Sequence, residues 1–268
     1  MPEGHILHRL ADQLTTAFAG RRVAVSSPQG RFAAEALLLD GHTIDRARAV
    51  GKHLFVEFDD ERVVHIHLGL IGRMTVEPPH PVVGQVRLRI ATEAYVADLR
   101  GPQGCRLTGP AAEEAMIARL GPDPLDPQAD PERAYDRLHR SHRPLAAVLL
   151  DQSVLAGVGN VYRAEVLFRQ GLDPLLPADD LTPAQWSRLW ADLVGLMAEG
   201  CRAGRIDTVR PEHTPEAMGR PPRVDDHGGE VYVYRRAGRP CLVCGTPVRR
   251  RELAGRNLYW CPTCQPER

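Results

Sequence analysis

The 268-residue sequence predicts an α+β protein with a β-rich N-terminal part, a helical middle part and a C-terminal zinc finger. Three observations favour this fold class. Short runs of β-branched and aromatic residues fill the sequence from Val23 to about Leu107. Apolar residues recur with helical spacing after residue 131. Two Cys-x2-Cys pairs lie near the end of the chain.

The N-terminal part begins with a predicted helix over residues 5–18, where apolar side chains from Ile6 to Phe18 repeat at helical spacing. Gly20 is expected to end it. The β-rich runs that follow are 53–58, 62–68, 86–90 and 94–99, separated by turn signals such as Asp59-Asp60 and Pro78-Pro79. We therefore expect a β-sandwich or barrel-like domain over residues 1–120.

The segment 121–131 has four prolines and one glycine in eleven residues, which predicts a linker. The predicted helical domain spans 132–229. In it, Thr182 and Pro183 occupy the N-cap and first position of a helix. The stretch 204–229 is rich in Gly, Pro, Arg and Asp and is interpreted as a mobile loop. The helices are expected at 131–139, 144–151, 159–170 and 182–201, and a short strand at 231–235.

Four cysteines predict a metal centre in the C-terminal segment 230–268. Cys241-x2-Cys244 and Cys261-x2-Cys264 are separated by 16 residues. Each pair can grip one ion from a tight turn, and four thiolates complete the tetrahedron of a structural Zn²⁺ site. The ion is expected to stabilise a β-hairpin too small to fold alone. Cys105 and Cys201 lack such partners and are expected to be buried apolar residues.

The charge distribution favours a polyanionic partner although the net charge is zero. Residues 121–200 carry 7 basic and 12 acidic groups, whereas residues 201–268 carry 13 and 8, a net charge of +5. Such a basic module points to nucleic acid, with a merely solvated basic face as the alternative. No apolar run is long enough to span a membrane, and the N-terminus does not resemble a signal peptide. We expect a cytoplasmic location with reduced cysteines.

The N-terminus offers a nucleophile. If Met1 is removed, Pro2 becomes a free secondary amine, and an α-amine titrates near pH 8, below lysine at about 10.4. Condensation with an aldehyde carbon would give a cationic iminium that acidifies neighbouring protons. Glu3 could then transfer protons. Disordered termini are the common alternative, but the helix starting near Ile6 would hold this one in place.

Two further features indicate anion binding. Lys52 is the only lysine among 34 basic residues, and it offers a compact charge that arginine does not. A single lysine left by chance on a solvated surface is the alternative. The turn Gly157-Val158-Gly159-Asn160 opens a predicted helix, so its free N–H groups could bind a phosphate. A tight helix–helix joint without a ligand is the alternative.

Four segments together resemble the Fpg/Nei family of bifunctional DNA glycosylases, and its Nei (endonuclease VIII) branch in particular. They are Pro2-Glu3-Gly4, Lys52 in GKHLF (51–55), LLDQSVLAGVGN (149–160) and the cysteine segment 241–265, which ends in RNLYWCPTCQ. The resemblance implies an N-terminal β-sandwich with its terminal helix, a helix–two-turn–helix domain and a zinc finger. It also implies an enzyme that flips an oxidised base, pyrimidines foremost, out of damaged double-stranded DNA.

The resemblance further implies base removal and β,δ-elimination through an iminium on the N-terminal proline. The resemblance places Leu70 in a loop that fills the space left by the flipped base. An apolar side chain is physically suited to that task, and a plain core leucine is the alternative. His65 and His67 are expected to form hydrogen bonds and to make no metal site. The implied catalytic residues are Pro2, Glu3 and Lys52, and the implied DNA-binding residues are Leu70, Asn160 and Arg256.

Two departures from the family pattern leave alternatives open. His5-Ile6 stand where the family often has Pro-Glu, and the segment 98–104 contains Arg100 but no aromatic residue. The missing aromatic weakens any recognition of the base opposite 8-oxoguanine. An Fpg-like glycosylase for oxidised purines and a non-catalytic zinc-ribbon DNA-binding protein are the alternatives. We expect a monomer associated with the nucleoid, with single-stranded or bubble DNA open as further substrates. The loop 204–229 is expected to govern base selectivity.

Overall fold

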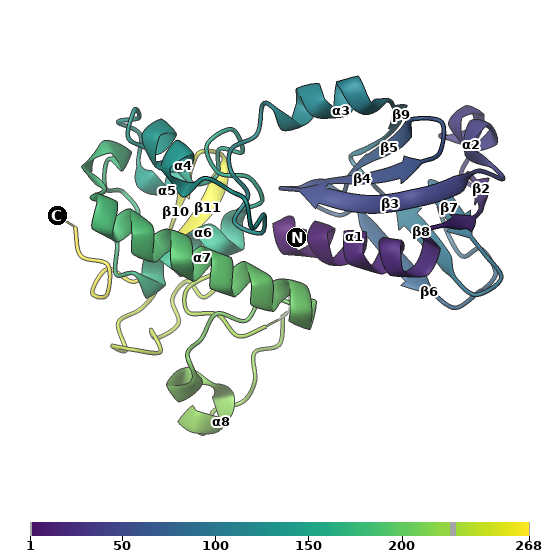
Figure 1. Cartoon of the computed structure of the whole chain (residues 1–268). Helices are drawn as coiled ribbons and strands as arrows, with labels where there is room; N and C mark the ends of the chain where they lie inside the picture. The colour runs from purple at the N-terminus through teal and green to yellow at the C-terminus, as the bar shows by residue number, and fades with distance from the viewer. Residues whose placement is uncertain (1, 226–228, 268) are drawn as a thin grey trace. The chain divides into compact units, whose positions relative to one another are not determined.

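The computed structural model describes residues 2–225 and 229–267 of the chain (Figure 1). Contacts between Cα atoms divide the chain into two compact units, residues 1–119 and 120–268. Unit 1 contains most of the strands, and unit 2 contains most of the helices together with a small hairpin. Each unit is described by itself below.

Unit 1 consists of an N-terminal helix and two antiparallel sheets (Figure 1). The five-stranded sheet has the order β1-β3-β4-β5-β9, and the four-stranded sheet has the order β2-β7-β8-β6. Two further helices complete the unit. The elements are α1 (Gly4–Phe18), β1 (Arg21–Arg22), β2 (Ala24–Ser26), α2 (Ala33–Leu39), β3 (Thr43–Val50), β4 (His53–Phe58), β5 (Arg62–His67), β6 (Arg73–Glu77), β7 (Leu88–Ala91), β8 (Val96–Arg100), β9 (Gly104–Thr108) and α3 (Pro110–Ile117).

Both sheets and α1 contribute side chains to one apolar core, so the predicted β-sandwich with its terminal helix is confirmed. Alternation sends every second side chain of β7 inward, whereas the central strands β4 and β5 bury consecutive side chains on both faces. The helix contributes one face to the same core, because residues three and four apart lie on one side. The core includes Leu7, Leu10 and Leu14 from α1, Val56, Val64 and Ile66 from the larger sheet, and Leu88, Ile90 and Leu99 from the smaller one.

A buried ion pair joins the strands of the smaller sheet. Asp98 on β8 is fully buried and lies opposite Arg89 on β7. Its carboxylate accepts two hydrogen bonds from Arg89, both at 2.7 Å, and one from Arg100 at 2.7 Å. Burial alone would raise the pKa of Asp98, but the two guanidinium groups outweigh it and lower that pKa. Arg100 is therefore held by its own sheet, and it also donates to the Val83 carbonyl at 3.2 Å.

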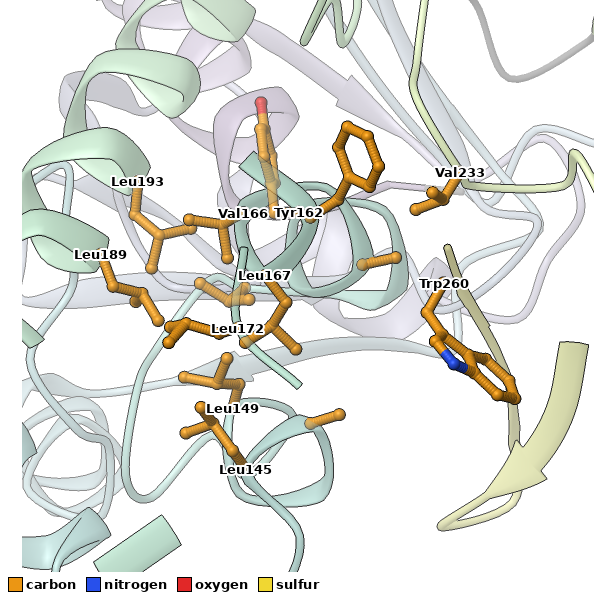
Figure 2. Close-up of a cluster of buried hydrophobic side chains, with 14 of the residues drawn as sticks. Leu145, Leu149, Tyr162, Val166, Leu167, Leu172, Leu189, Leu193, Val233 and Trp260 are labelled. Carbon is orange, nitrogen blue, oxygen red and sulfur yellow. The ribbon is translucent and has the colours of Figure 1, made fainter. Parts of the chain in front are cut away.

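In the described residues of unit 2, 120–225 and 229–267, five helices, two short 3₁₀ turns and a hairpin pack around a second apolar core, part of which Figure 2 shows. The helices predicted at 131–139, 159–170 and 182–201 are observed within a few residues, whereas the one predicted at 144–151 is a single turn. The elements are α4 (Pro131–Leu138), α5 (Leu145–Val148), α6 (Asn160–Arg169), η1 (Ala178–Asp180), α7 (Pro183–Ala203), η2 (Pro211–His213), α8 (Pro215–Met218), β10 (Arg249–Leu253) and β11 (Arg256–Trp260).

The helices of unit 2 meet through aliphatic side chains, with aromatic rings at the edge of the cluster (Figure 2). Leu189 and Leu193 of α7 face the side chains of α6, and Leu145 and Leu149 lie on the other side of that cluster. Trp260 of β11 packs against the same core and so attaches the hairpin to the helices. The segment after Arg119 is held to this unit as well: the Gly121 amide donates to the Gln152 carbonyl at 2.8 Å, and the Ala156 amide to the Pro122 carbonyl at 3.0 Å.

The prediction of a strand at 231–235 is wrong, because no strand is observed there. The amides of Tyr232, Val233 and Tyr234 donate to the carboxylate of Glu165, at 2.7, 2.9 and 2.8 Å, and not to a neighbouring strand. Val231 to Tyr234 are all buried in the core, as in a fully buried strand. The Glu165 carboxylate takes the place of a neighbouring strand as acceptor for the buried amides.

The segment 204–229 contains the short elements η2 and α8, and its residues 226–228 lie outside the described part of the chain. Thr214 caps α8 by accepting from the Ala217 amide at 3.3 Å. Within the described ranges, 2–225 and 229–267, no helix has the length and apolar character that a membrane crossing demands.

Helix α7 begins at Pro183 with Thr182 as its N-cap, as predicted, and Gln185 completes a capping box. The Thr182 hydroxyl accepts from the Gln185 amide at 3.3 Å, and the Gln185 side chain accepts from the Thr182 amide at 2.9 Å. We expect Thr182→Ala to lower the free energy of unfolding of unit 2 by about 1 kcal/mol, because amides of the first turn lose their partner. Urea denaturation followed by Trp fluorescence measures this, since Trp186 and Trp190 lie on α7. Thr182→Ser retains the hydroxyl and is expected to keep most of that stability; equal losses would contradict the capping role.

Candidate active site and nucleic-acid interface

The N-terminus is anchored by α1. Glu3 is the N-cap residue of this helix, with extended backbone angles, and its side chain is fully buried. The Ile6 amide donates to the Glu3 carbonyl at 3.0 Å, which closes the first turn. His5 is also buried, and burial followed by neighbouring positive charge lowers its pKa to about 3. Pro2 therefore precedes a fixed helix, and the dipeptide Pro2-Glu3 has a defined place in unit 1.

Lys52 lies in a two-residue turn between β3 and β4. Val50 and His53 form the last paired residues of these strands, which leaves Gly51 and Lys52 to make the turn. Gly51 has a φ of +57°, a conformation that favours glycine. Burial lowers the pKa of His53 and of His67, and the positive charge of the half-buried Lys52 lowers both further. A single fixed ammonium group thus stands beside two imidazoles.

Leu70 lies at the tip of the loop between β5 and β6. Its side chain is 52 % exposed and that of Ile71 is 88 % exposed, whereas Leu68 is 2 % exposed. The alternative of a core leucine therefore applies to Leu68 and not to Leu70. The Gly72 amide donates to the Leu68 carbonyl at 3.0 Å, so the loop is closed at its base. Exposed apolar side chains on a closed loop are suited to insertion between bases. The sequence analysis did not name Ile71 as a second exposed apolar residue of this loop, although it directly follows Leu70 in HLGLIG.

Asn160 lies next to Asn257, the residue that follows Arg256 on β11. Asn160 is the first residue of α6, and its amide nitrogen donates to the Asn257 carbonyl at 3.0 Å. Arg163, fully buried and one helical turn further on, donates to the Asn160 side-chain oxygen and so fixes the orientation of the amide. Arg256 is exposed and follows a turn in which Ala254 and Gly255 both have positive φ. The sequence analysis did not name Arg163. Its spacing of three residues from Asn160 places both on one face of a helix and could have indicated the contact.

The turn that precedes α6 is fixed by one side chain. Gln152 accepts from the Gly157 amide at 3.0 Å and donates to the Val158 carbonyl at 2.9 Å. Gly157 has a φ of +85°, which explains why a glycine is needed there. The turn is therefore a tight joint that leads directly into α6.

The four predicted cysteine ligands converge. The sulfur atoms of Cys241, Cys244, Cys261 and Cys264 all lie within 4.8 Å of one another. Cys241 and Cys264 are 3.9 Å apart and Cys244 and Cys261 are 3.4 Å apart. Sulfur atoms about 2.3 Å from one zinc in a tetrahedron are about 3.8 Å apart, so the cluster fits one ion. With four thiolates no position is open to substrate, and zinc supplies structure there.

The fold combines an N-terminal β-sandwich with its terminal helix, a helical unit and a hairpin with four clustered cysteines. Three family models match the chain: the N-terminal domain of formamidopyrimidine-DNA glycosylase over residues 1–105, its H2TH domain over 120–210, and a zinc finger found in Fpg and isoleucyl-tRNA synthetase over 238–266. The chain belongs to the Fpg/Nei family of DNA glycosylases.

Curated relatives match over almost the whole chain. "Endonuclease 8 1" of Mycobacterium tuberculosis is 48% identical over 99% of this chain and 100% of its own length. "Probable endonuclease 8 2" of Streptomyces coelicolor is 36% identical over 99% and 94%. "Formamidopyrimidine-DNA glycosylase" of Parasynechococcus marenigrum is 34% identical over 99% of both chains.

Solved structures show the same architecture. The MutM (Fpg) protein of Thermus thermophilus has a TM-score of 0.76 at 30% identity and covers 99% of both chains. The Lactococcus lactis Fpg bound to DNA with an abasic site has a TM-score of 0.80 at 20% identity, over 99% of this chain and 100% of its own. The latter likeness concerns the fold alone.

Removal of zinc is expected to release the hairpin and to spare the sheets of unit 1. Without the ion, four thiolates no longer hold the segments around Cys241 and Cys261 together. Chelation should therefore raise the amide exchange rates of β10 and β11, while β4 and β5 keep their protection, as hydrogen exchange with mass spectrometry can measure. Cys201→Ser serves as the control, because this cysteine lies outside the cluster. Equal loss of protection in β4 and β5 would contradict a local role for the ion.

Proposed function

We propose that the chain is a base-excision repair enzyme, a DNA glycosylase and abasic-site lyase that removes oxidised bases, pyrimidines foremost, from damaged double-stranded DNA. The observation that carries this proposal is the dipeptide Pro2-Glu3 anchored at the start of α1, with Glu3 fully buried. Full-length similarity to proteins named endonuclease 8, at 48% and 36% identity, supports the same activity.

The first half of the reaction is base removal. Once Met1 is cleaved off, the Pro2 nitrogen attacks C1′ of the flipped nucleotide with its lone pair. The bond between C1′ and the base breaks, and the base leaves with a proton. Glu3 gives or takes protons at the sugar, because its buried carboxyl group is the acid or base nearest in sequence to the nucleophile. The sugar ring opens, and C1′ and the Pro2 nitrogen form a cationic iminium.

The second half is strand cleavage. The iminium withdraws electrons, so a proton on C2′ becomes acidic and is lost to a base. The C3′–O bond then breaks and the phosphate on the 3′ side leaves. A second elimination expels the phosphate on the 5′ side, and water hydrolyses the iminium and frees Pro2. The product is a one-nucleotide gap flanked by phosphates.

The remaining site residues bind DNA in this proposal. Lys52 holds a phosphate near the lesion, Asn160 and Arg256 hold backbone phosphates, and Leu70 fills the space left by the base. The adjacency of Asn160 to the hairpin that carries Arg256 supports the second role, and the exposure of Leu70 supports the third.

We also propose that residues 1–120, 132–229 and 230–268 form separate domains with a linker at 121–131, and that the enzyme acts as a monomer on the nucleoid.

An Fpg-like activity on oxidised purines is the second candidate, because a relative named formamidopyrimidine-DNA glycosylase is 34% identical over the full chain. Duplexes that each carry one lesion separate the two. Faster excision of thymine glycol or 5-hydroxycytosine than of 8-oxoguanine supports the pyrimidine assignment. The reverse order would replace it by the purine assignment.

The Pro2 mechanism predicts a covalent complex. We expect borohydride to trap the enzyme on an abasic or thymine-glycol duplex, because reduction fixes the iminium. A form with one extra residue before Pro2 should not be trapped, since its Pro2 nitrogen is then an amide without a lone pair to donate. Gel electrophoresis measures trapping, and the intact mass shows whether Met1 is removed. Full trapping of the extended form would exclude Pro2 as the nucleophile, and a wild-type chain that retains Met1 and forms no complex would favour a non-catalytic DNA-binding protein.

Lys52→Arg is expected to slow base excision by about tenfold or more, a barrier increase of about 1.4 kcal/mol. The two-residue turn leaves little room to move the wider guanidinium into the place of an ammonium. Single-turnover rates on a thymine-glycol duplex measure this. Arg46→Lys is the matched control, because Arg46 is exposed and pairs with Glu57, and we expect no more than a twofold change there. Full activity of Lys52→Arg would mean that the single lysine is an accident of composition.

A further inference from the structure

Two histidines of unit 1 form a hydrogen-bonded pair that the reaction described above does not use. Nδ1 of His53 and Nε2 of His65 lie 2.8 Å apart, and the ring planes are inclined by only 23° with centroids at 5.1 Å, so the rings meet edge to edge. The ring of His65 is in turn stacked on Phe55 at 5.2 Å. His65 is 8 % exposed and Phe55 is fully buried. The pair is therefore a built part of the sheet and not a surface coincidence.

The pair joins two elements that carry proposed DNA contacts. His53 directly follows Lys52 at the start of β4. His65 lies on β5, which leads into the loop with Leu70. The ring of His67 stands edge-on to His53 at 5.2 Å, and its Nδ1 accepts from the Gly69 amide at 3.2 Å. One side-chain hydrogen bond thus links the Lys52 turn to the strand that supports the Leu70 loop.

The surroundings favour uncharged imidazoles. Lys52 on the turn and Arg106, which is opposite His65 on β9, bring positive charge to the pair. Arg48 on β3 lies over Phe55 at 5.6 Å, and its charge is met by Glu57 of β4 and Glu113 of α3. Burial first, then the neighbouring imidazoles, and last the cations Lys52 and Arg106, lower the pKa of His53 and of His65 to about 4. Since the unfolded value is near 6.5, stability from the neutral pair is complete above pH 6.5 and is lost as pH falls toward 4.

We infer that His53 and His65 act together as a neutral, hydrogen-bonded pair of positioning residues that fixes Lys52 for its phosphate. An N···N hydrogen bond needs one nitrogen with a proton and one without. A pair protonated on both rings would oppose two N–H groups and add charge beside Lys52. This inference rests on the proposed function, because it assigns to the pair the placement of the phosphate-binding lysine.

The test is a thermodynamic cycle between His65 and Lys52, measured as the Kd for a duplex with a tetrahydrofuran abasic analogue. His65→Leu removes the hydrogen bond and keeps an apolar side chain, and we expect it to weaken binding about fivefold, as for one lost hydrogen bond. In a Lys52→Met background the same change should cost less than about twofold, because there is no lysine left to position. His65→Gln offers an amide in place of Nε2 and should bind within about twofold of wild type.

Each result decides the inference. Unchanged binding by His65→Leu, an equal loss with and without Lys52, or a loss in His65→Gln as large as in His65→Leu would each overturn it. ¹⁵N NMR of the wild-type histidines gives a check that needs no variant: neutral rings at pH 6 support the pair, and two imidazolium rings contradict it. If the wild-type protein does not prefer the abasic duplex to an undamaged one, the proposed function fails, which is a different outcome from unchanged binding by His65→Leu.

Discussion

The buried carboxylate of Glu165 is the constraint on which unit 2 depends. It accepts the amides of Tyr232, Val233 and Tyr234 and also the Thr208 hydroxyl at 2.6 Å. A fully buried carboxylate would be costly without such partners, and three buried amides would be costly without an acceptor. The three amides supply hydrogen bonds to the carboxylate, and the carboxylate supplies the acceptor for the amides. The chain that leads to the zinc finger is consequently fixed onto α6 without a strand partner.

The same helix connects the other functional parts of unit 2. Asn160 at its start holds the hairpin through Asn257, and Arg169 near its end donates to the Thr208 carbonyl at 2.6 Å and pairs with Asp192 of α7. Beyond the helix, Gln265 next to the last cysteine donates to the Leu172 carbonyl at 2.9 Å. The zinc finger is therefore attached on both sides of its metal cluster, and the ion only has to hold the hairpin together. This division explains how so small a module can present Arg256 at a fixed place.

Charge at the sites is local, and the net charge of zero says little about it. Many arginines are occupied within the fold: Arg89 and Arg100 hold Asp98, and Arg46 and Arg48 hold Glu57. Those on the hairpin, such as Arg256, are exposed. In unit 1 the imidazoles of His53 and His67 lie near Lys52, and burial lowers the pKa of both. Polyanion binding thus depends on which cations remain exposed, and not on their number.

The sequence by itself determined the elements whose signals are local. The helical spacing from Ile6 to Phe18, the capping residue Thr182 and the spacing of the four cysteines each depend on neighbours in the chain, and α1, the start of α7 and the sulfur cluster were predicted from them. Only the tertiary structure decided that residues 231–235 are not a strand, that Leu70 is exposed while Leu68 is buried, and that His53 pairs with His65. In each case the deciding partner lies far away in sequence or on another strand, and a one-dimensional pattern carries no record of which distant group will satisfy a buried amide or ring.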